Sequence, residues 1–429
     1  MNHSTNTTLT ASKGETLQRT RNQILLGILI AVVLPAAIRY NFTYLGGSEN
    51  NLYNTAIGGV VALVIGYIGY RRLYVFPGYA AGGYVLTSFS MTFGALAVVL
   101  IMLRIDYSRL QLLASYLITV ALFTFIHLRV FAKRSLILGV VPNGATDRLP
   151  DFARVIWHRM SSPSEPLPPL QGVVVDLNAD HSDEWSSRIA AFALEGTPVY
   201  HVSEAIEQLS GRVEINHLSE NTLGSLNPND FYLKLKAVLD FIAALALLIF
   251  TGPLLLVVAV LIRLDSPGPA LFRQPRTGFR ARPFVIYKFR TMQVTAPQSA
   301  ADARVHAMTQ DNDPRITKLG AFLRRSRIDE LPQLINVLKG EMSLIGPRPE
   351  AVALTQWYEK EIPFYHYRHI IKPGITGWGQ VNLGHVADVD DVRRKLDLDF
   401  YYVKNFSAWL DILIVLRTIQ TMLTGNGAK

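Results

Sequence analysis

Four long apolar stretches in the first third of the chain set the main constraint on its fold. They lie near residues 22–40, 53–70, 79–103 and 110–128, and each is near or above the ~20 residues that cross a bilayer as a helix. Only 17% of the 429 residues are charged, while 49% are hydrophobic. Ordinary soluble proteins carry about 25% charged residues. The sequence therefore predicts a multi-domain membrane protein that begins with a four-helix transmembrane bundle over residues 22–130.

A cleaved signal peptide is the alternative for the first stretch, but its apolar run exceeds the usual ~7–15 residues and three further spans follow it. Basic residues cluster before the first span, after the second and after the fourth, and the other two loops carry few. By the positive-inside rule both ends of the bundle face the cytoplasm. Residues 1–21 form the cytoplasmic N-terminus, and their Ser/Thr/Asn-rich composition predicts disorder.

The net charge of +9 favours an anionic partner. Because the basic residues flank apolar spans, anionic lipid headgroups and a phosphorylated substrate fit better than nucleic acid, which we exclude. The chain has no cysteine, so disulfides and thiolate metal sites are also excluded.

Residues 135–227 have a soluble composition and predict a small α/β middle domain of the Rossmann-like kind, a parallel sheet with helices on its faces. Strands are expected at 135–141, 172–178, 198–202 and 212–218, and helices at 147–160, 182–196 (capped by Ser182) and 203–211. The first strand-to-helix turn, LGVVPNGATD, lacks the G-x-G-x-x-G spacing of a dinucleotide site. We interpret the domain as a structural or regulatory module, and its histidines as surface or packing residues: His158, His181 and His201.

A fifth apolar stretch, about 238–264, decides the topology of everything after it. Basic residues stand on both of its sides, Asp240 lies within it, and Gly252-Pro253 falls near its centre. These features favour a re-entrant membrane helix hairpin, broken at Gly252 and Pro253, that returns to the cytoplasmic face. An ordinary spanning helix with a proline kink is the alternative.

Residues 326–350, SRIDELPQLINVLKGEMSLIGPRPE, hold the densest chemistry in the chain. The adjacent carboxylates of Asp329 and Glu330 suit a reaction on phosphate, because one carboxylate can attack or hold a metal while cations neutralise developing charge. Alternatively, Ser326-x-x-Asp329 forms a capping box and Asp329 only caps a helix. The same region contains more basic residues than a helix cap requires: Arg315, Lys318, Arg324, Arg325 and Arg327.

Three flanking motifs add candidate contacts. Arg348 lies between two prolines on a stiff backbone and can present a bidentate fork to phosphate, or pair with Glu350 on the surface. Lys288 and Arg290, in YKFRTM, alternate with apolar residues along an expected strand. The loop KPGITGWGQVN, residues 372–382, has glycines that permit close backbone approach, a tryptophan that can stack or sit at the membrane interface, and Gln380 as an expected substrate contact.

Together these motifs resemble the bacterial sugar transferase family, the monotopic phosphoglycosyl transferases that start surface glycan synthesis. The resemblance covers roughly residues 231–422, and the preceding segments look like those of the family's large members. It implies a mainly α-helical α+β catalytic domain over residues 231–429. The chain departs from the family in having Gly252 where many members have serine, and in lacking a glycine-rich signature in the middle domain.

By resemblance, Asp329 is the nucleophile and Glu330 a ligand of Mg²⁺. The side chains expected to contact phosphate or other parts of the substrate are Lys288, Arg290, Arg315, Arg325, Arg327, Arg348 and Gln380. The implied reaction moves a sugar-1-phosphate from a UDP-sugar to polyprenyl (undecaprenyl) phosphate and releases UMP. The implied place is the cytoplasmic face of the bacterial inner membrane.

Two other functions stay open at this point, a non-catalytic nucleotide-sensing scaffold for polysaccharide export and a transferase without a covalent intermediate. The sequence does not identify the sugar or the oligomeric state, although a homodimer is compatible with it. We expect the tail, residues 397–423, to lie against the bilayer, anchored by Tyr401, Tyr402 and Trp409.

Overall fold

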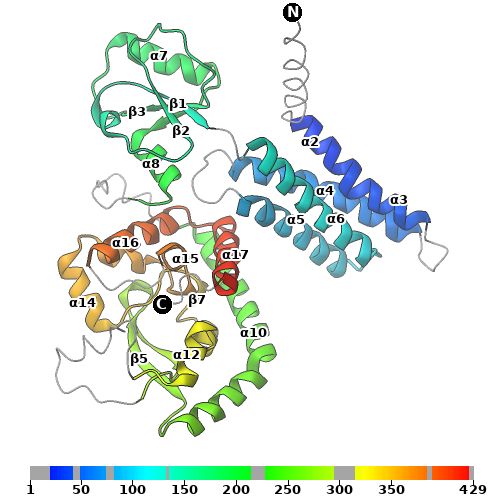
Figure 1. The fold of residues 1–429 in the computed structure, drawn as a ribbon, viewed down its shortest axis with the longest axis vertical. Helices are drawn as coiled ribbons and strands as arrows, with labels where there is room; N and C mark the ends of the chain where they lie inside the picture. Colours follow the sequence, from blue (N-terminus) through cyan, green and yellow to red (C-terminus); the bar gives the residue numbers. More distant parts are fainter. Residues whose placement is uncertain are drawn as a thin grey trace, which may run out of the picture. The chain divides into compact units, whose positions relative to one another are not determined.

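The computed structural model describes residues 20–41, 49–73, 82–131, 135–213, 228–293, 315–383 and 389–424. The chain divides into two compact units, Met1–Ser210 and Gly211–Lys429 (Figure 1). Residues 1–19, where disorder is expected, and most of the strand expected at 212–218 lie outside the described residues. So do several of the basic residues used for the orientation, including Lys13, Arg19, Lys133 and Arg134.

Four helical segments of the first unit coincide with the four apolar stretches. They are a continuous segment made of α2 (Thr20–Gly27), the π-helical η1 (Ile28–Val33) and α3 (Leu34–Asn41), followed by α4 (Glu49–Leu73), α5 (Gly82–Met102) and α6 (Arg109–Ile126), which η3 (His127–Phe131) extends. They share a core that includes Leu63, Phe89 and Phe123. By length and composition these four and α10 (Asp230–Asp265) are the five described helices that could cross a membrane.

The soluble part of the first unit is built on a parallel sheet in the order β2-β1-β3-β4. Its elements are β1 (Leu136–Val140), η4 (Gly144–Arg148), β2 (Val155–Arg159), β3 (Gly172–Val175), α7 (Asp183–Leu194), β4 (Val199–His201) and α8 (Val202–Ser210). The oxygen of Ser182 accepts the Trp185 N–H and caps α7, as the sequence predicts. The expected parallel arrangement is therefore present in the described residues.

One expected element of this sheet is wrong. Residues 147–160 do not form a helix; they contain the end of a 3₁₀ turn and strand β2, whose Val155 pairs with Leu136 of β1. Val155 and Ile156 are β-branched and favour a strand, and Pro150 disfavours a helix that would run through it. The indole of Trp157 donates to the Pro150 carbonyl at 3.0 Å and holds the turn that leads into the strand.

The second unit begins at Gly211, before the boundary expected near residue 231, because residues at its start bond to its helices. The Trp378 indole donates to the Gly211 carbonyl, and the Val213 N–H to the Asp397 carbonyl, both at 3.0 Å. The other elements are β5 (Leu271–Thr277), η7 (Phe279–Ala281), β6 (Pro283–Phe289), α12 (Lys318–Arg325), η8 (Ile328–Gln333), α13 (Leu334–Leu338), β7 (Ser343–Ile345), α14 (Val352–Glu361), η9 (Tyr365–Ile370), β8 (Gly374–Thr376), α15 (Trp378–Leu383), α16 (Val389–Lys404) and α17 (Ala408–Thr424).

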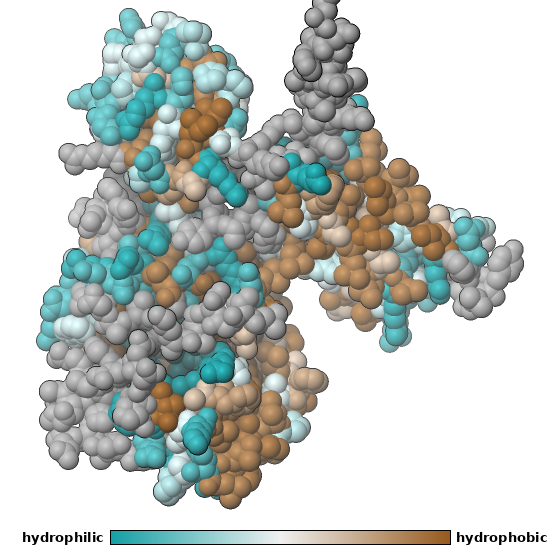
Figure 2. All heavy atoms as spheres, in the orientation of Figure 1, coloured by the Kyte–Doolittle hydropathy of each residue, from teal (hydrophilic) through white to brown (hydrophobic). Residues whose placement is uncertain are grey.

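Helix α10 packs against this unit on both sides of a largely exposed stretch. Ala244 lies in one apolar cluster with Phe284 and Ile286 of β6, and Val258 lies in another with Phe289 of the same strand. No residue between Ala244 and Val258 is buried. Figure 2 shows the resulting apolar surface where Figure 1 places α10. The helix continues through Gly252 and Pro253, and its ribbon bends rather than breaks (Figure 1).

A buried polar cluster ties the first half of α10 to the rest of the unit. Lys236 Nζ lies 2.8 Å from Asp411 Oδ2 of α17, and Ser343 of β7 donates to Asp240 at 2.6 Å. The Tyr402 hydroxyl donates to Asp411 Oδ1 at 2.5 Å. The acidic residue inside the apolar stretch is therefore satisfied by protein rather than exposed to lipid, as buried charges require.

Of the three aromatic residues expected to anchor the tail at the bilayer, Tyr402 is buried at 1% exposure, and Tyr401 and Trp409 are half-buried. Trp378 of α15 is buried, stacks with Tyr401 at 5.9 Å between ring centroids, and receives the Arg417 guanidinium over its face at 4.6 Å. Burial argues against Tyr402 as an anchor, and a membrane contact of Trp409 stays a prediction.

Candidate active site

The two adjacent carboxylates lie in η8, a short 3₁₀ helix that follows a sharp change of direction. Arg327 has a left-handed backbone (φ 58°) and separates η8 from α12. Ser326 donates back to the carbonyls of Phe322 and Leu323, so it closes α12 and does not cap η8. The capping-box interpretation of Asp329 is therefore wrong, and its carboxylate is available for another task.

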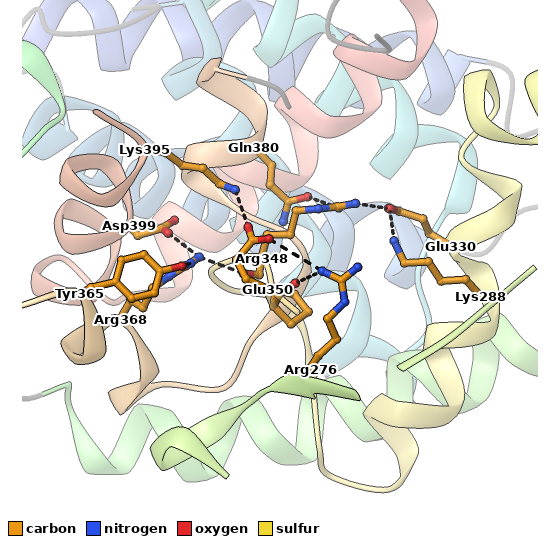
Figure 3. Close-up of polar contacts among 11 residues, drawn as sticks. Arg276, Lys288, Glu330, Arg348, Glu350, Tyr365, Arg368, Gln380, Lys395 and Asp399 are labelled. Atoms are coloured by element: carbon orange, nitrogen blue, oxygen red, sulfur yellow. Dashed lines mark hydrogen bonds and ion pairs between the residues drawn. The ribbon is translucent and has the colours of Figure 1, made fainter. Parts of the chain in front are cut away.

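Glu330 is the centre of a buried ion-pair cluster. Its Oε1 accepts from Lys288 Nζ at 3.1 Å and from Arg348 Nη2 at 3.0 Å (Figure 3). Its Oε2 lies 3.8 Å from Arg327. Burial alone would raise the pKa of this carboxyl, but Lys288 and Arg348 outweigh burial and lower it. Glu330 is consequently ionised throughout the physiological range.

Asp329 has a contrasting environment. Its Oδ1 is buried and has no hydrogen-bond partner among the described residues. Burial, followed by repulsion from Glu330, raises the pKa of Asp329 to about 6. A buried acceptor without a donor is costly in a folded protein and is typical of a site that receives a ligand.

The cations beside Glu330 are held in a low-dielectric environment. Burial lowers the pKa of Lys288 to about 8, against the opposing pull of Glu330. Arg348 has the reverse balance, because the attraction of Glu330 raises its pKa despite burial. Both cations are positive at neutral pH and can transfer their attraction from Glu330 to an incoming phosphate.

Arg348 is brought to Glu330 by the close approach of two backbone segments. Strands β7 and β8 pair in parallel, and a side chain at Gly374 would overlap the Gly346 backbone. Gln380 of α15 accepts from Arg348 Nη1 at 3.2 Å, so the guanidinium bridges Glu330 and Gln380. Close backbone approach by the glycine loop is confirmed, and Arg348 pairs with Glu330 rather than with Glu350 at the surface.

Three further predicted site residues make contacts elsewhere or are exposed. Arg290 donates to the carbonyls of Ile262, Pro267 and Ser266 and so holds the end of α10. Arg325 ends α12 and is exposed, and the Arg315 carbonyl accepts the Gln293 N–H. A phosphate contact from these three side chains stays a prediction.

A second buried charge network adjoins the first and was missed from the sequence. Lys395 donates to Glu350 at 3.0 Å, and Arg368 lies 2.8 Å from Asp399 (Figure 3). Arg276 bonds to the Pro349 carbonyl at 3.0 Å. The one available signal was the placement of Lys395 and Asp399 four residues apart on the inward face of α16, where charged residues are unexpected.

The acidic residues fit a divalent metal that is shared with a diphosphate, and not one held by protein alone. The described residues contain no group of three His, Asp or Glu side chains arranged for a metal. Asp329 and Glu330 supply at most two carboxylates, which is the usual protein contribution to Mg²⁺ when substrate phosphates and waters complete its shell. The unpartnered Asp329 Oδ1 is the observation that leaves room for such a ligand.

Comparison with known proteins gives matches over the second unit and over nearly the whole chain. Residues 231–425 match the family described as bacterial sugar transferase. The chain is 42% identical to a UDP-N-acetylgalactosamine-undecaprenyl-phosphate N-acetylgalactosaminephosphotransferase of Aeromonas hydrophila, over 94% of this chain and 95% of the relative. It is 39% identical to a UDP-glucose:undecaprenyl-phosphate glucose-1-phosphate transferase of Escherichia coli (strain K12), over 50% of this chain and 44% of the relative. A galactosyl transferase of Streptococcus agalactiae is 43% identical over 45% of this chain and 43% of its own length.

Proposed function

The chain belongs to the bacterial sugar transferase family, and we propose that it transfers a sugar-1-phosphate from a UDP-sugar to undecaprenyl phosphate, the initiating step of polysaccharide synthesis. The products are UMP and undecaprenyl diphosphate sugar. The observation that carries the proposal is the pairing of Glu330 with Lys288 and Arg348 beside the unpartnered oxygen of Asp329. UDP-N-acetylgalactosamine is the first donor to test, since the relative matched over 95% of its length is named for it.

We propose a covalent route in two displacements. An Asp329 carboxylate oxygen attacks the sugar-bearing phosphorus, forming an oxygen–phosphorus bond while the bond to the bridging oxygen breaks and UMP leaves with that oxygen. A phosphate oxygen of undecaprenyl phosphate then attacks the same phosphorus and releases the Asp329 carboxylate. The absence of a hydrogen bond to Asp329 Oδ1 supports this role, because an unbonded oxygen is the better nucleophile.

Lys288 and Arg348 stabilise the charge that develops on the diphosphate during both steps. Each is already buried and paired with one oxygen of Glu330, so both cations are in the site before substrate arrives. We propose that Glu330 would hold Mg²⁺, which would supply charge neutralisation at the diphosphate. Lys288 and Arg348, both beside Glu330, would then bind phosphate oxygens.

For the membrane, we propose that α10 is a re-entrant helix and that the second unit stays on the cytoplasmic face. The start of α10 is bonded to the second unit through Lys236 and Asp411, and its end through Arg290 and the Ile262 carbonyl, and this supports a helix whose ends share one side of a bilayer. The exposed middle of α10 is then the part that enters the lipid. The four apolar helices of the first unit form the transmembrane bundle of an inner-membrane protein, and the parallel sheet is a Rossmann-like structural or regulatory module.

The function is tested with purified protein, undecaprenyl phosphate, Mg²⁺ and a panel of UDP-sugars, scored for UMP and for the lipid-linked sugar. We expect one donor to give both products in equal amounts. Absence of lipid-linked sugar with every donor would reject the proposed transfer. Turnover that survives complete chelation of divalent cations would reject the metal.

A further inference from the structure

The turn that carries Arg348 depends on hydrogen-bond donors from elsewhere in the unit. Pro347 and Pro349 have no N–H, so the turn has few donors of its own. Four consecutive carbonyls nevertheless accept hydrogen bonds: that of Pro347 from the Gly374 N–H at 2.9 Å, Arg348 from Arg368 Nη2 at 2.9 Å, Pro349 from Arg276 Nη1 at 3.0 Å, and Glu350 from the Thr277 N–H at 3.0 Å. Partners far away in sequence therefore fix the backbone of Arg348.

Among these four donors, Arg368 also contacts two other side chains. Besides the Arg348 carbonyl, its guanidinium bonds to the Tyr365 hydroxyl at 2.6 Å and lies 2.8 Å from Asp399 Oδ2 (Figure 3). Arg368 is 3% exposed and Asp399 is 2% exposed. One fork thus joins η9, α16 and the turn of Arg348 in the interior of the unit.

The geometry suits arginine and no other cation. A guanidinium is planar and presents five donors in fixed directions, whereas an ammonium group is compact and its donors rotate. Lysine at this position can keep the ion pair with Asp399, but it cannot reach three acceptors in three directions. Burial opposes the charge of Arg368, yet Tyr365 and Asp399 raise its pKa overall, so the fork stays charged.

We propose that Arg368 is a positioning residue for sugar-phosphate transfer: anchored by Asp399 and Tyr365, it fixes the Arg348 carbonyl and so aims the Arg348 guanidinium at the substrate diphosphate. This inference rests on the proposed function, because Arg348 is taken there as a diphosphate contact. A displacement of about 1 Å in such a group costs about 100-fold in rate. Arg368 acts only through Arg348 and does not itself touch substrate.

The first test compares Arg368→Lys and Asp399→Asn with a matched control on the same helix. Asp391 pairs with Arg394 at the surface of α16, so Asp391→Asn also removes one carboxylate from an ion pair. We expect both interior variants to raise KM for the UDP-sugar and lower kcat, with kcat/KM reduced about 10- to 100-fold. The activity of the Asp391→Asn control should change less than about 2-fold, since its ion pair does not support the Arg348 turn.

The second test is a double-mutant cycle with Arg348→Lys, measured as kcat/KM and as the calorimetric affinity for UDP-sugar. If Arg368 acts through Arg348, Arg368→Lys should cost less than about 2-fold in the Arg348→Lys background. Equal costs in both backgrounds, or a loss that only follows the folded fraction, would overturn the inference. Should Arg368→Lys not fold, Tyr365→Phe replaces it in the cycle, because it removes one hydrogen bond and keeps the ring.

The control separates the two proposals. Wild-type protein and Asp391→Asn must both release UMP in an acceptor-dependent way if the proposed function is right. Should they not, the affinity arm of the cycle still reports whether Arg368 and Arg348 are coupled in binding the donor.

Discussion

Asp329 and Glu330 are neighbours in the chain but have opposite electrostatic environments. Glu330 is held as an anion by Lys288 and Arg348, while burial and the charge of Glu330 keep Asp329 readily protonated. Such a division lets two carboxyl groups perform different tasks in one site. The residue that already has partners suits charge balance and metal binding, and the residue without them suits attack on phosphorus.

Replacing Asp329, the proposed nucleophile, should lower activity and raise stability. We expect Asp329→Asn to abolish exchange of labelled UMP into UDP-sugar without lipid acceptor, because an amide is a poor nucleophile. Exchange by wild type alone is the control, and robust acceptor-dependent turnover by the variant would contradict the covalent route.

Because the pKa of Asp329 is raised in the folded state, its carboxyl costs stability as pH rises from about 4 through 6. The variant should therefore be more stable at pH 7.5, on the order of 2 kcal/mol, and thermal unfolding in detergent checks this.

The same groups predict a bell-shaped pH profile for UMP exchange. Asp329 must lose its proton to attack, so the rate should rise with pH through about 6. Lys288, whose pKa burial lowers to about 8, should lose its charge above that value and the rate should fall. Lys288→Arg keeps its charge at high pH and should remove the upper limb alone. A profile that is flat between pH 5 and 9 would show that neither group controls the reaction.

The sequence located Asp329, Glu330, Lys288, Arg348 and Gln380, because each stands in a dense local motif. It could not tell which cations reach the carboxylates. Lys288 and Arg290 are two residues apart, yet one bonds to Glu330 and the other to three carbonyls at the end of α10. The second charge network was missed for a related reason, since Glu350 pairs with Arg276, which lies 74 residues before it, and with Lys395, which lies 45 residues after it.

At the scale of elements, the pairing of β7 with β8 sets the position of the Arg348 turn. The two strands approach so closely that Gly374 faces the Gly346 backbone, where no side chain fits. Arg348 is two residues beyond this contact. A change in the distance between the two strands would therefore move Arg348 relative to Glu330.

Gly374→Ala should consequently impair both stability and activity. We expect a loss of about 1–3 kcal/mol, because the added methyl group must displace backbone, and a rise in KM for UDP-sugar as Arg348 moves. Gly252→Ala in α10 is the matched control, since nothing lies within 4 Å of the added group. It should leave activity unchanged and stabilise the helix by about 0.5–1 kcal/mol. Equal kinetic effects of the two substitutions would contradict this account of β7 and β8.

The length of apolar stretches and the presence of capping residues predicted helices correctly where short-range sequence patterns determine the structure. The four apolar helices, the cap of α7 at Ser182 and the strand containing Lys288 all follow from short-range pattern. The helix predicted for residues 147–160 was wrong because the spacing of their polar and apolar residues fits a helix, while the segment pairs with β1 as a strand. Pro150, the β-branched residues Val155 and Ile156, and the pairing with β1 together outweigh the helical spacing there.

At the scale of the whole molecule, α10 decides on which side of the membrane the chemistry takes place. Because the start and the end of α10 are both bonded to the second unit, we expect residues before and after the helix to be reached from the same side. The chain has no cysteine, so single cysteines can report this without background labelling.

We expect cysteines at Asp230 and Gln293, both exposed, to react with an impermeant reagent only from the cytoplasmic side. A cysteine at Asp106, between α5 and α6, should react only from outside and serves as the control. Reaction at Gln293 from outside, with Asp230 still cytoplasmic, would establish a spanning helix and move the carboxylates across the membrane.

The residues that hold the Arg348 turn in place are synthesised after the turn itself. Asp329, Glu330 and the Arg348 turn are translated before Arg368, Gly374 and Asp399. A nascent chain therefore contains the two carboxylates before it contains the residues that hold the Arg348 turn in place. Helix α10 is made earlier still and can meet the membrane first. The enzyme is therefore expected to reach its lipid before it can consume nucleotide sugar, and an unfinished chain released from the ribosome should be inert.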